Sequence, residues 1–183
     1  MEGARDDAQG LREPDLGAAG RILLIVTKAV AIAGGLVFVA LVAMEIVSIV
    51  GRKVFSAPVP GDVEILQMCA AFASATFFAY CHLIGGDVKV DFFTHNLRPH
   101  RIDFLDAIGS LLVGLFGALL AWRTAAGALV LKEVGETSAV LGWPVWFAQA
   151  LMVPGFVLLA LAGFYVAGHR LRRARALREA ARS

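Results

Sequence analysis

The chain has 183 residues, of which 58% are hydrophobic, and its mean hydropathy is +0.73. This apolar share exceeds that of a typical water-soluble domain, so we expect much of the surface to face lipid or other helices. The formal net charge is only +2, and the charged side chains are collected at a few places in the chain. A charge balance of this kind gives no indication of nucleic-acid binding.

Four apolar runs are long enough to cross a bilayer, which takes about 20 residues of helix. They cover residues 22–50, 64–84, 105–131 and 143–168. Lipid offers backbone groups no hydrogen-bond partner, and the runs lack the alternation of a barrel strand, so all four should be helices. The sequence therefore predicts an all-α integral membrane domain over residues 22–168.

Lys and Arg residues are distributed unevenly between the two sides of this predicted bundle. Twelve lie on the side of the termini: Arg5, Arg12, Arg21, Lys89, Arg98, Arg101, Arg170, Arg172, Arg173, Arg175, Arg178 and Arg182. Three lie on the other side: Arg52, Lys53 and Lys132. Because basic residues are retained in the cytoplasm, both termini and the middle loop are expected there. Residues 1–21 then form a disordered cytoplasmic tail and residues 169–183 a basic one.

Residues that usually bind metals or cofactors are poorly placed for that role. Cys69 and Cys81 are about 18 Å apart on one predicted helix, too far for a disulfide. The histidines, including His82 at the inner end of the second run, are expected to be solvated or interfacial. A haem or metal bundle needs such side chains inside the spans. The sequence predicts no metal, cofactor or catalytic residue.

Charged residues inside a span are costly unless they find a partner or reach water. Lys28 lies near the inner end of the first run and is able to snorkel. Glu45 and Arg123 fall in the outer half of the first and third runs. Two hypotheses are equally favoured: these two form an ion pair, or each reaches the headgroups separately.

Small residues recur at four-residue spacing in two runs, which favours close approach of another helix. They are Ser110, Gly114 and Ala118 in the third run, and Ala71, Ala75 and Ala79 in the second. The spacing does not decide whether the approaching helix belongs to this chain or to a partner. A Pro154-Gly155 pair in the fourth run predicts a bend.

The middle loop, residues 85–97, has a pattern of its own. On a helix, Val90, Phe93 and Leu97 share one face, while Asp91 and His95 share another. This separation predicts a short amphipathic helix lying in the membrane interface, between the second and third spans.

Three local patterns resemble a known family. Arg52 ends the first run and is followed by Pro58, Pro60 and Glu64, the last opening the second run. Residues 87–93 place Asp91 after a basic and apolar pair, and residues 135–146 place Pro144 before an aromatic at the start of the last run. With its size and four spans, the chain resembles, over residues 21–168, the DctQ-type small membrane subunit of tripartite ATP-independent periplasmic (TRAP) transporters. Lys89 departs from the histidine found there in many relatives.

The resemblance implies an accessory subunit of the bacterial inner membrane that performs no bond chemistry. Its expected partners are membrane lipid, a large permease subunit that holds the Na⁺ and substrate sites, and a periplasmic binding protein that delivers an organic anion. The candidates for structural or partner-interface roles are Glu45, Arg52, Glu64, Asp91, Arg123 and Pro144.

Two other classes of protein remain open from the sequence. The nearer is the four-span small subunit of the tripartite tricarboxylate transporters, which also pairs with a large permease. The more distant is a stand-alone membrane enzyme. An enzyme would need polar groups converging within the spans, and Glu45, Arg123 and Lys28 are the ones available to it.

Overall fold

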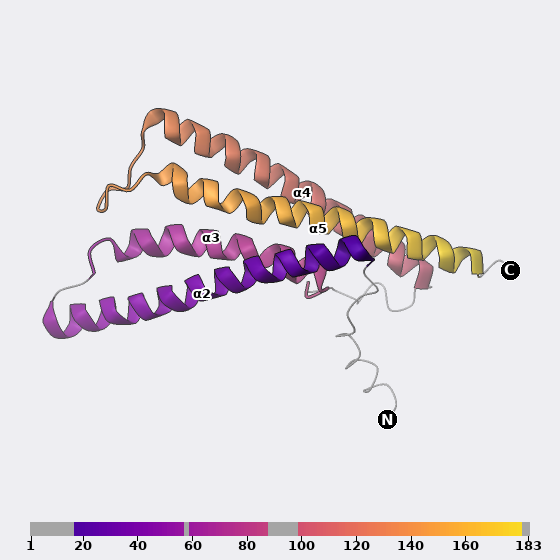
Figure 1. Cartoon of the computed structure of the whole chain (residues 1–183), viewed down its shortest axis with the longest axis horizontal. Helices are drawn as coiled ribbons and strands as arrows, with labels where there is room; N and C mark the ends of the chain where they lie inside the picture. Colours follow the sequence, from indigo (N-terminus) through magenta and orange to yellow (C-terminus); the bar gives the residue numbers. More distant parts are fainter. Residues whose placement is uncertain (1–16, 57–58, 88–98, 181–183) are drawn as a thin grey trace, which may run out of the picture.

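The structure is a computed structural model, and it describes residues 17–56, 59–87 and 99–180. The described residues form four helices: α2 (Ala18–Phe55), α3 (Asp62–Leu83), α4 (Pro99–Val134) and α5 (Val145–Ala180) (Figure 1). Each is long and apolar enough to cross a membrane. The predicted all-α fold with four transmembrane helices is therefore confirmed. The residues that define the predicted interfacial helix, from Val90 to Leu97, lie outside the described part.

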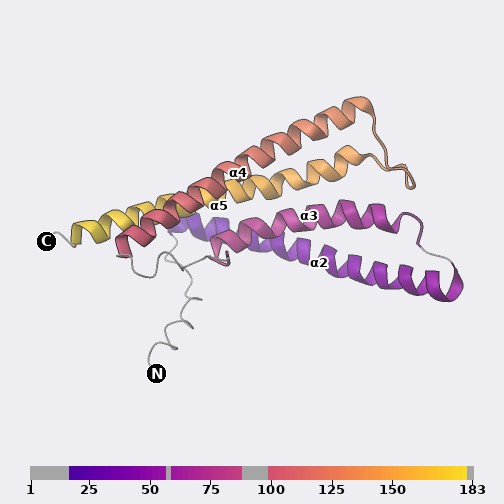
Figure 2. The same ribbon diagram turned by 180° about the vertical axis from the view of Figure 1, so that it is seen from behind.

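The helices form two antiparallel hairpins, α2 with α3 and α4 with α5. The hairpins meet where α3 packs against α5, and the contact between α2 and α5 is small. Figures 1 and 2 show the resulting order α2, α3, α5, α4 and the divergence of the hairpins toward the loops at residues 56–61 and 135–144. Helices α2 and α4 make no contact in the part of the chain that the structure describes.

Small residues bring α4 and α5 together. A Cβ atom on Gly163 of α5 would lie 2.5 Å from the Cα atom of Gly114 in α4, and one on Gly117 would lie 2.8 Å from the backbone nitrogen of Ala160. Of the predicted stripe in α4, Ser110 and Gly114 are buried, while Ala118 is exposed. A helix of this chain therefore occupies the close-approach groove.

Helix α5 also contacts α3 through small residues. A Cβ atom on Gly155 would lie 2.7 Å from the carbonyl oxygen of Ala75, and Ala75 and Ala79 are both buried. Pro154 lies within α5 and has no N–H to donate to the preceding turn, yet the helix runs on to Ala180. The small residues of α3 thus also serve packing within the chain.

Ion pairs join α4 and α5 at the end near the C-terminus. Arg170 pairs with Asp106, and its Nη1 atom lies 3.6 Å from Oδ1 of Asp103. The Nε atom of Arg173 lies 3.4 Å from Oδ2 of Asp103. These ion pairs stabilise the parts of α4 and α5 that extend beyond the apolar runs.

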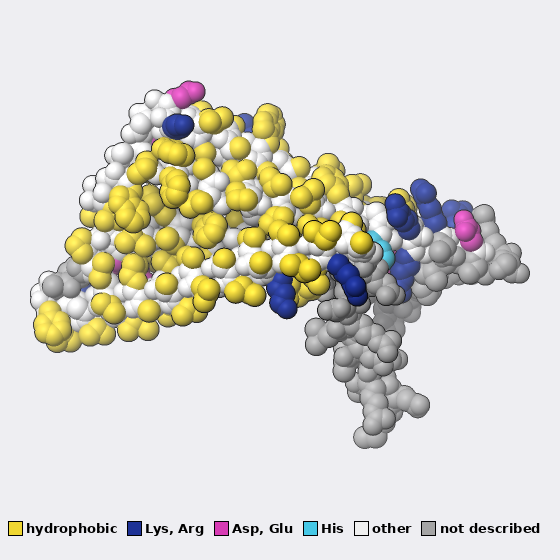
Figure 3. All heavy atoms as spheres, in the orientation of Figure 1, with side chains coloured by type: hydrophobic (Ala, Val, Ile, Leu, Met, Phe, Trp, Pro, Cys, Tyr) yellow, Lys and Arg dark blue, Asp and Glu magenta, His cyan; other side chains and the backbone are white. Residues whose placement is uncertain are grey.

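The outer surface is strongly apolar. Large exposed hydrophobic side chains occur on all four helices, among them Leu36, Phe78, Phe116 and Leu161. Figure 3 shows hydrophobic side chains over the diverging part of the bundle and Lys and Arg side chains gathered toward the C-terminal end. Such a surface suits lipid or a membrane-embedded partner.

Candidate functional site

A polar cluster joins α2 to α3 at the corner between them. The Oδ2 atom of Asp62 accepts hydrogen bonds from Ser48 Oγ at 2.5 Å and from Arg52 Nη2 at 2.8 Å. Ser48 and Arg52 are one turn apart on α2, so both reach the same carboxylate. Asp62 Oδ1 accepts a bond from the backbone N–H of Val63 at 2.8 Å, at the positive end of the α3 dipole.

The cluster is largely closed to solvent. Ser48 is fully buried and also accepts a hydrogen bond from the backbone N–H of Val59 at 3.3 Å, while Asp62 is 8% exposed. The side chain of Arg52 is 59% exposed and covers the pair from outside. Sequence analysis singled out Arg52 but missed Ser48 and Asp62. The available signal was an acidic residue directly after Pro60 and Gly61, where a helix N-terminus favours negative charge.

Glu64 connects the two hairpins. Its Oε1 atom accepts a hydrogen bond from the backbone N–H of Val140 at 2.8 Å, and its Oε2 atom one from Leu141 at 3.1 Å. Both amides belong to the loop between α4 and α5. Glu64, predicted to serve structure or a partner interface, thus binds a loop of its own chain.

The loop itself is held by its backbone and packs onto the other hairpin. The N–H of Ser138 donates to the carbonyl of Trp143 at 2.8 Å, and Pro144 directly precedes the first residue of α5. The side chain of Leu141 lies over Gly61, where an added Cβ atom would come within 2.6 Å of its Cγ atom. Gly61 also has φ of +73°, a conformation that favours glycine.

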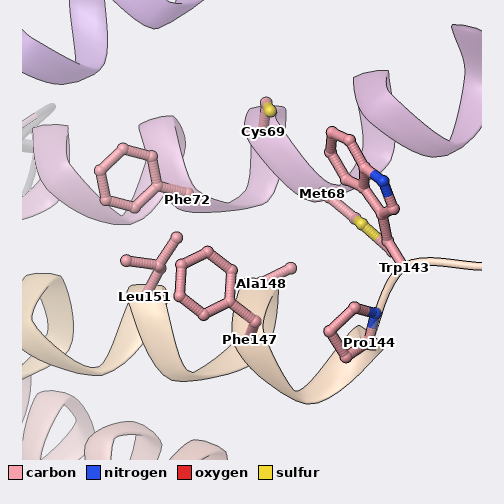
Figure 4. A pocket seen from close by; sticks show the side chains of 8 residues that line it. All are labelled: Met68, Cys69, Phe72, Trp143, Pro144, Phe147, Ala148 and Leu151. Carbon is pink, nitrogen blue, oxygen red and sulfur yellow. The ribbon is translucent and has the colours of Figure 1, made fainter. Parts of the chain in front are cut away.

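An apolar cavity of about 400 Å³ opens between α3 and α5 beside this loop (Figure 4). Its walls come from α3 and from the start of α5 with the two residues before it: Met68, Cys69, Phe72, Trp143, Pro144, Phe147, Ala148 and Leu151. The side chains of Phe147 and Leu151 point from α5 toward α3, where Phe72 lies (Figure 4). The lining suits an apolar group and supplies no acid, base or nucleophile except the Cys69 thiol.

The proposed ion pair between Glu45 and Arg123 is wrong. Glu45 lies on α2 and Arg123 on α4, the two helices that α3 and α5 separate (Figures 1 and 2). The Oε1 atom of Glu45 is buried without a hydrogen-bond partner among the described residues. Arg123 is exposed on the outside of α4.

Asp91, the last of the candidates, lies outside the described residues. His82, expected to be solvated or interfacial, is buried at 6% exposure, with its Nδ1 atom 2.6 Å from Oδ2 of Asp87. Within the described ranges, no group of three or more His, Cys, Asp or Glu residues is placed to hold a metal ion.

Comparison with known proteins gives one family. Residues 41–173 match the model of the family described as tripartite ATP-independent periplasmic transporters, DctQ component. No curated protein and no solved structure matches the chain. The matched region extends from Leu41 within α2 to Arg173, one of the ion-paired residues of α5. It favours this family over the tricarboxylate transporter subunit that the sequence left open.

Proposed function

The chain belongs to the DctQ component family of the tripartite ATP-independent periplasmic transporters, and from this we propose that it braces a large permease subunit during Na⁺-coupled uptake of an organic acid. In this proposal a periplasmic binding protein delivers the acid, and the large subunit holds the transport sites. The family match over residues 41–173 is the observation that carries the proposal.

The build of the bundle supports a bracing role. Transporter sites usually lie near the bilayer midplane, where polar side chains and interrupted helices converge. Here α3 and α5 approach closely at Ala75 and Gly155, α4 and α5 approach closely at Gly114 and Gly163, and α5 is continuous past Pro154. Helices packed so closely form a stiff unit whose outer apolar faces are free to contact lipid and a larger subunit.

We further propose that this multi-pass membrane protein lies in the bacterial inner membrane with both termini in the cytoplasm. The uneven distribution of Lys and Arg supports this orientation. A reporter fused after Ser183 and one inserted between Gly85 and Arg101 should both report the cytoplasm, whereas one near Pro58 should report the periplasm. A periplasmic signal from the Ser183 fusion would contradict the orientation.

Transport should require partners. Reconstituted alone in liposomes, the chain should give no uptake of a labelled carboxylate. Adding the large permease subunit and the binding protein encoded with it should give uptake that falls to background when K⁺ replaces Na⁺. Uptake by the purified chain alone would refute the accessory role, and uptake indifferent to Na⁺ would refute the coupling.

A further inference from the structure

Arg123 presents a charge on the outside of α4, away from the other helices that the structure describes. It is exposed, and the structure gives it no hydrogen bond or ion pair within the described residues. Helix α4 packs against α5 alone among the described helices, so no other described helix covers the opposite side of α4. The neighbouring Trp122 is 67% exposed on that side.

The depth of Arg123 places it within the apolar part of α4. It lies 17 residues beyond Asp106, which belongs to the ion pairs at the inner end, so the two are about 25 Å apart along the helix. At the outer end, the Nζ atom of Lys132 lies 5.2 Å from the ring centre of Trp146, as expected near an interface. Arg123 is nine residues, or about 13 Å, below Lys132.

Neither an ion pair with Glu45 nor snorkelling to the headgroups readily stabilises the Arg123 charge. The Glu45 carboxylate lies on α2, which does not contact α4 in the described part of the chain. Snorkelling toward the nearer headgroups is opposed by helix geometry, because each Cα–Cβ bond tilts toward the helix N-terminus, which for α4 is the end of the Asp106 ion pairs. A guanidinium held at this depth therefore needs an acceptor from outside the chain.

We propose that the Trp122 and Arg123 side of α4 docks on a transmembrane helix of the large permease subunit, and that Arg123 binds a carboxylate on that helix. The partner's identity rests on the proposed function. A carboxylate matches the planar guanidinium through two parallel hydrogen bonds, and a ring beside it excludes water from the pair. Tryptophan and arginine are also the residue types that most often anchor protein interfaces. Phe116 and Leu119, both exposed on α4, extend the apolar surface around them.

Retention of the large subunit tests the docking. The tagged full chain is co-expressed with the large permease subunit, purified in mild detergent, and the ratio of the two proteins is measured. Arg123→Leu should lower this ratio about tenfold, which corresponds to about 1.4 kcal/mol of binding free energy. Lys28→Leu, which removes an exposed charge from α2, is the matched control and should leave the ratio unchanged. The thermal melting of the chain purified alone should not fall for either variant.

The outcomes separate this inference from the proposed function. Wild-type chain that retains no large permease subunit would overturn both. Retention by wild type and by Arg123→Leu to the same extent would overturn the docking and leave the proposed function standing. A parallel fall in melting temperature of the isolated variant would assign Arg123 to the fold and overturn the docking.

A second measurement distinguishes a protein carboxylate from a lipid phosphate. A photo-crosslinking residue at position 122 should capture the large subunit, whereas one at position 36 on α2 should not. Arg123→Glu should lose the large subunit and regain it when one acidic residue in a transmembrane helix of that subunit is changed to arginine. Capture of phospholipid at position 122, with phosphatidylglycerol binding that depends on Arg123, would show that Arg123 binds a lipid phosphate. That result would overturn the proposed carboxylate partner.

Discussion

Replacing Gly163 by alanine is expected to loosen the contact between α4 and α5. The added Cβ atom would lie 2.5 Å from the backbone N and Cα atoms of Gly114 and 2.9 Å from the carbonyl oxygen of Ser110. These are helix backbone atoms, so neither neighbour can rotate away and the helices must separate. Over-packing of this kind costs about 1–3 kcal/mol, and a leucine should cost more. Since α5 is the helix that holds α4, the loss should appear as release of α4.

The measurement is thermal melting of the purified chain in detergent, together with the yield of a disulfide between cysteines engineered on facing positions of α4 and α5. Gly168→Ala is the matched control, because an added Cβ atom there meets no atom within 4 Å. Replacing a helical glycine by alanine is otherwise favourable by up to about 1 kcal/mol. Gly163→Ala should therefore melt lower than wild type and Gly168→Ala at the same temperature or higher. Equal melting of the two variants would contradict the close contact.

Changing Asp62 to alanine is expected to be the most damaging single change at the α2–α3 corner. It removes the acceptor of the buried Ser48 hydroxyl and of Arg52, and it takes a negative charge from the start of α3. Asp62→Asn keeps an oxygen for Ser48 and should be milder. Arg52→Gln should be milder still, because the Arg52 side chain is 59% exposed and solvent screens its contribution.

Folded yield after membrane extraction and melting temperature in detergent measure this effect. We expect the loss of melting temperature for Asp62→Ala to be at least about twice that for Arg52→Gln, because an orphaned buried group costs more than a solvated ion pair. Glu133→Ala, an exposed acid at the end of α4, is the control and should change little. If Arg52→Gln proved as harmful as Asp62→Ala, the exposed ion pair would dominate the corner, contrary to this account.

The helices were predictable from the sequence, but their ends were not. Apolar runs of sufficient length identify a membrane helix without knowledge of its neighbours. The continuation of α4 and α5 depends on Asp103, Asp106 and Arg170, which stabilise each other across two helices. In the sequence alone, the same charged residues indicate the end of a membrane span and give no sign that the helix continues beyond it. The helix ends therefore required knowledge of which helices are neighbours.

The order of the helices explains most of what sequence analysis missed in the candidate site. Pairing of Glu45 with Arg123 followed from their similar depth, yet depth does not show that α3 and α5 stand between them. Glu64 was recognised as a candidate, but its hydrogen-bond donors are the backbone N–H groups of Val140 and Leu141, and a backbone amide carries no sequence signal. Ser48 lies within an apolar run, where its hydroxyl gave no indication that Asp62 would face it.

The hydrogen bonds between Glu64 and the loop before α5 form late in the synthesis of the chain. Val140 and Leu141 lie 76 and 77 positions after Glu64, so the ribosome completes the first hairpin well before it makes the groups that this carboxylate binds. During that interval water has to solvate the carboxylate, and its place at the very start of α3, next to the loop, keeps water within reach. The Ser48, Arg52 and Asp62 corner has all its partners from the beginning. The first hairpin can therefore form its own polar contacts as it enters the membrane. The hydrogen bonds from Glu64 that join it to the second hairpin form only after the loop before α5 has been synthesised.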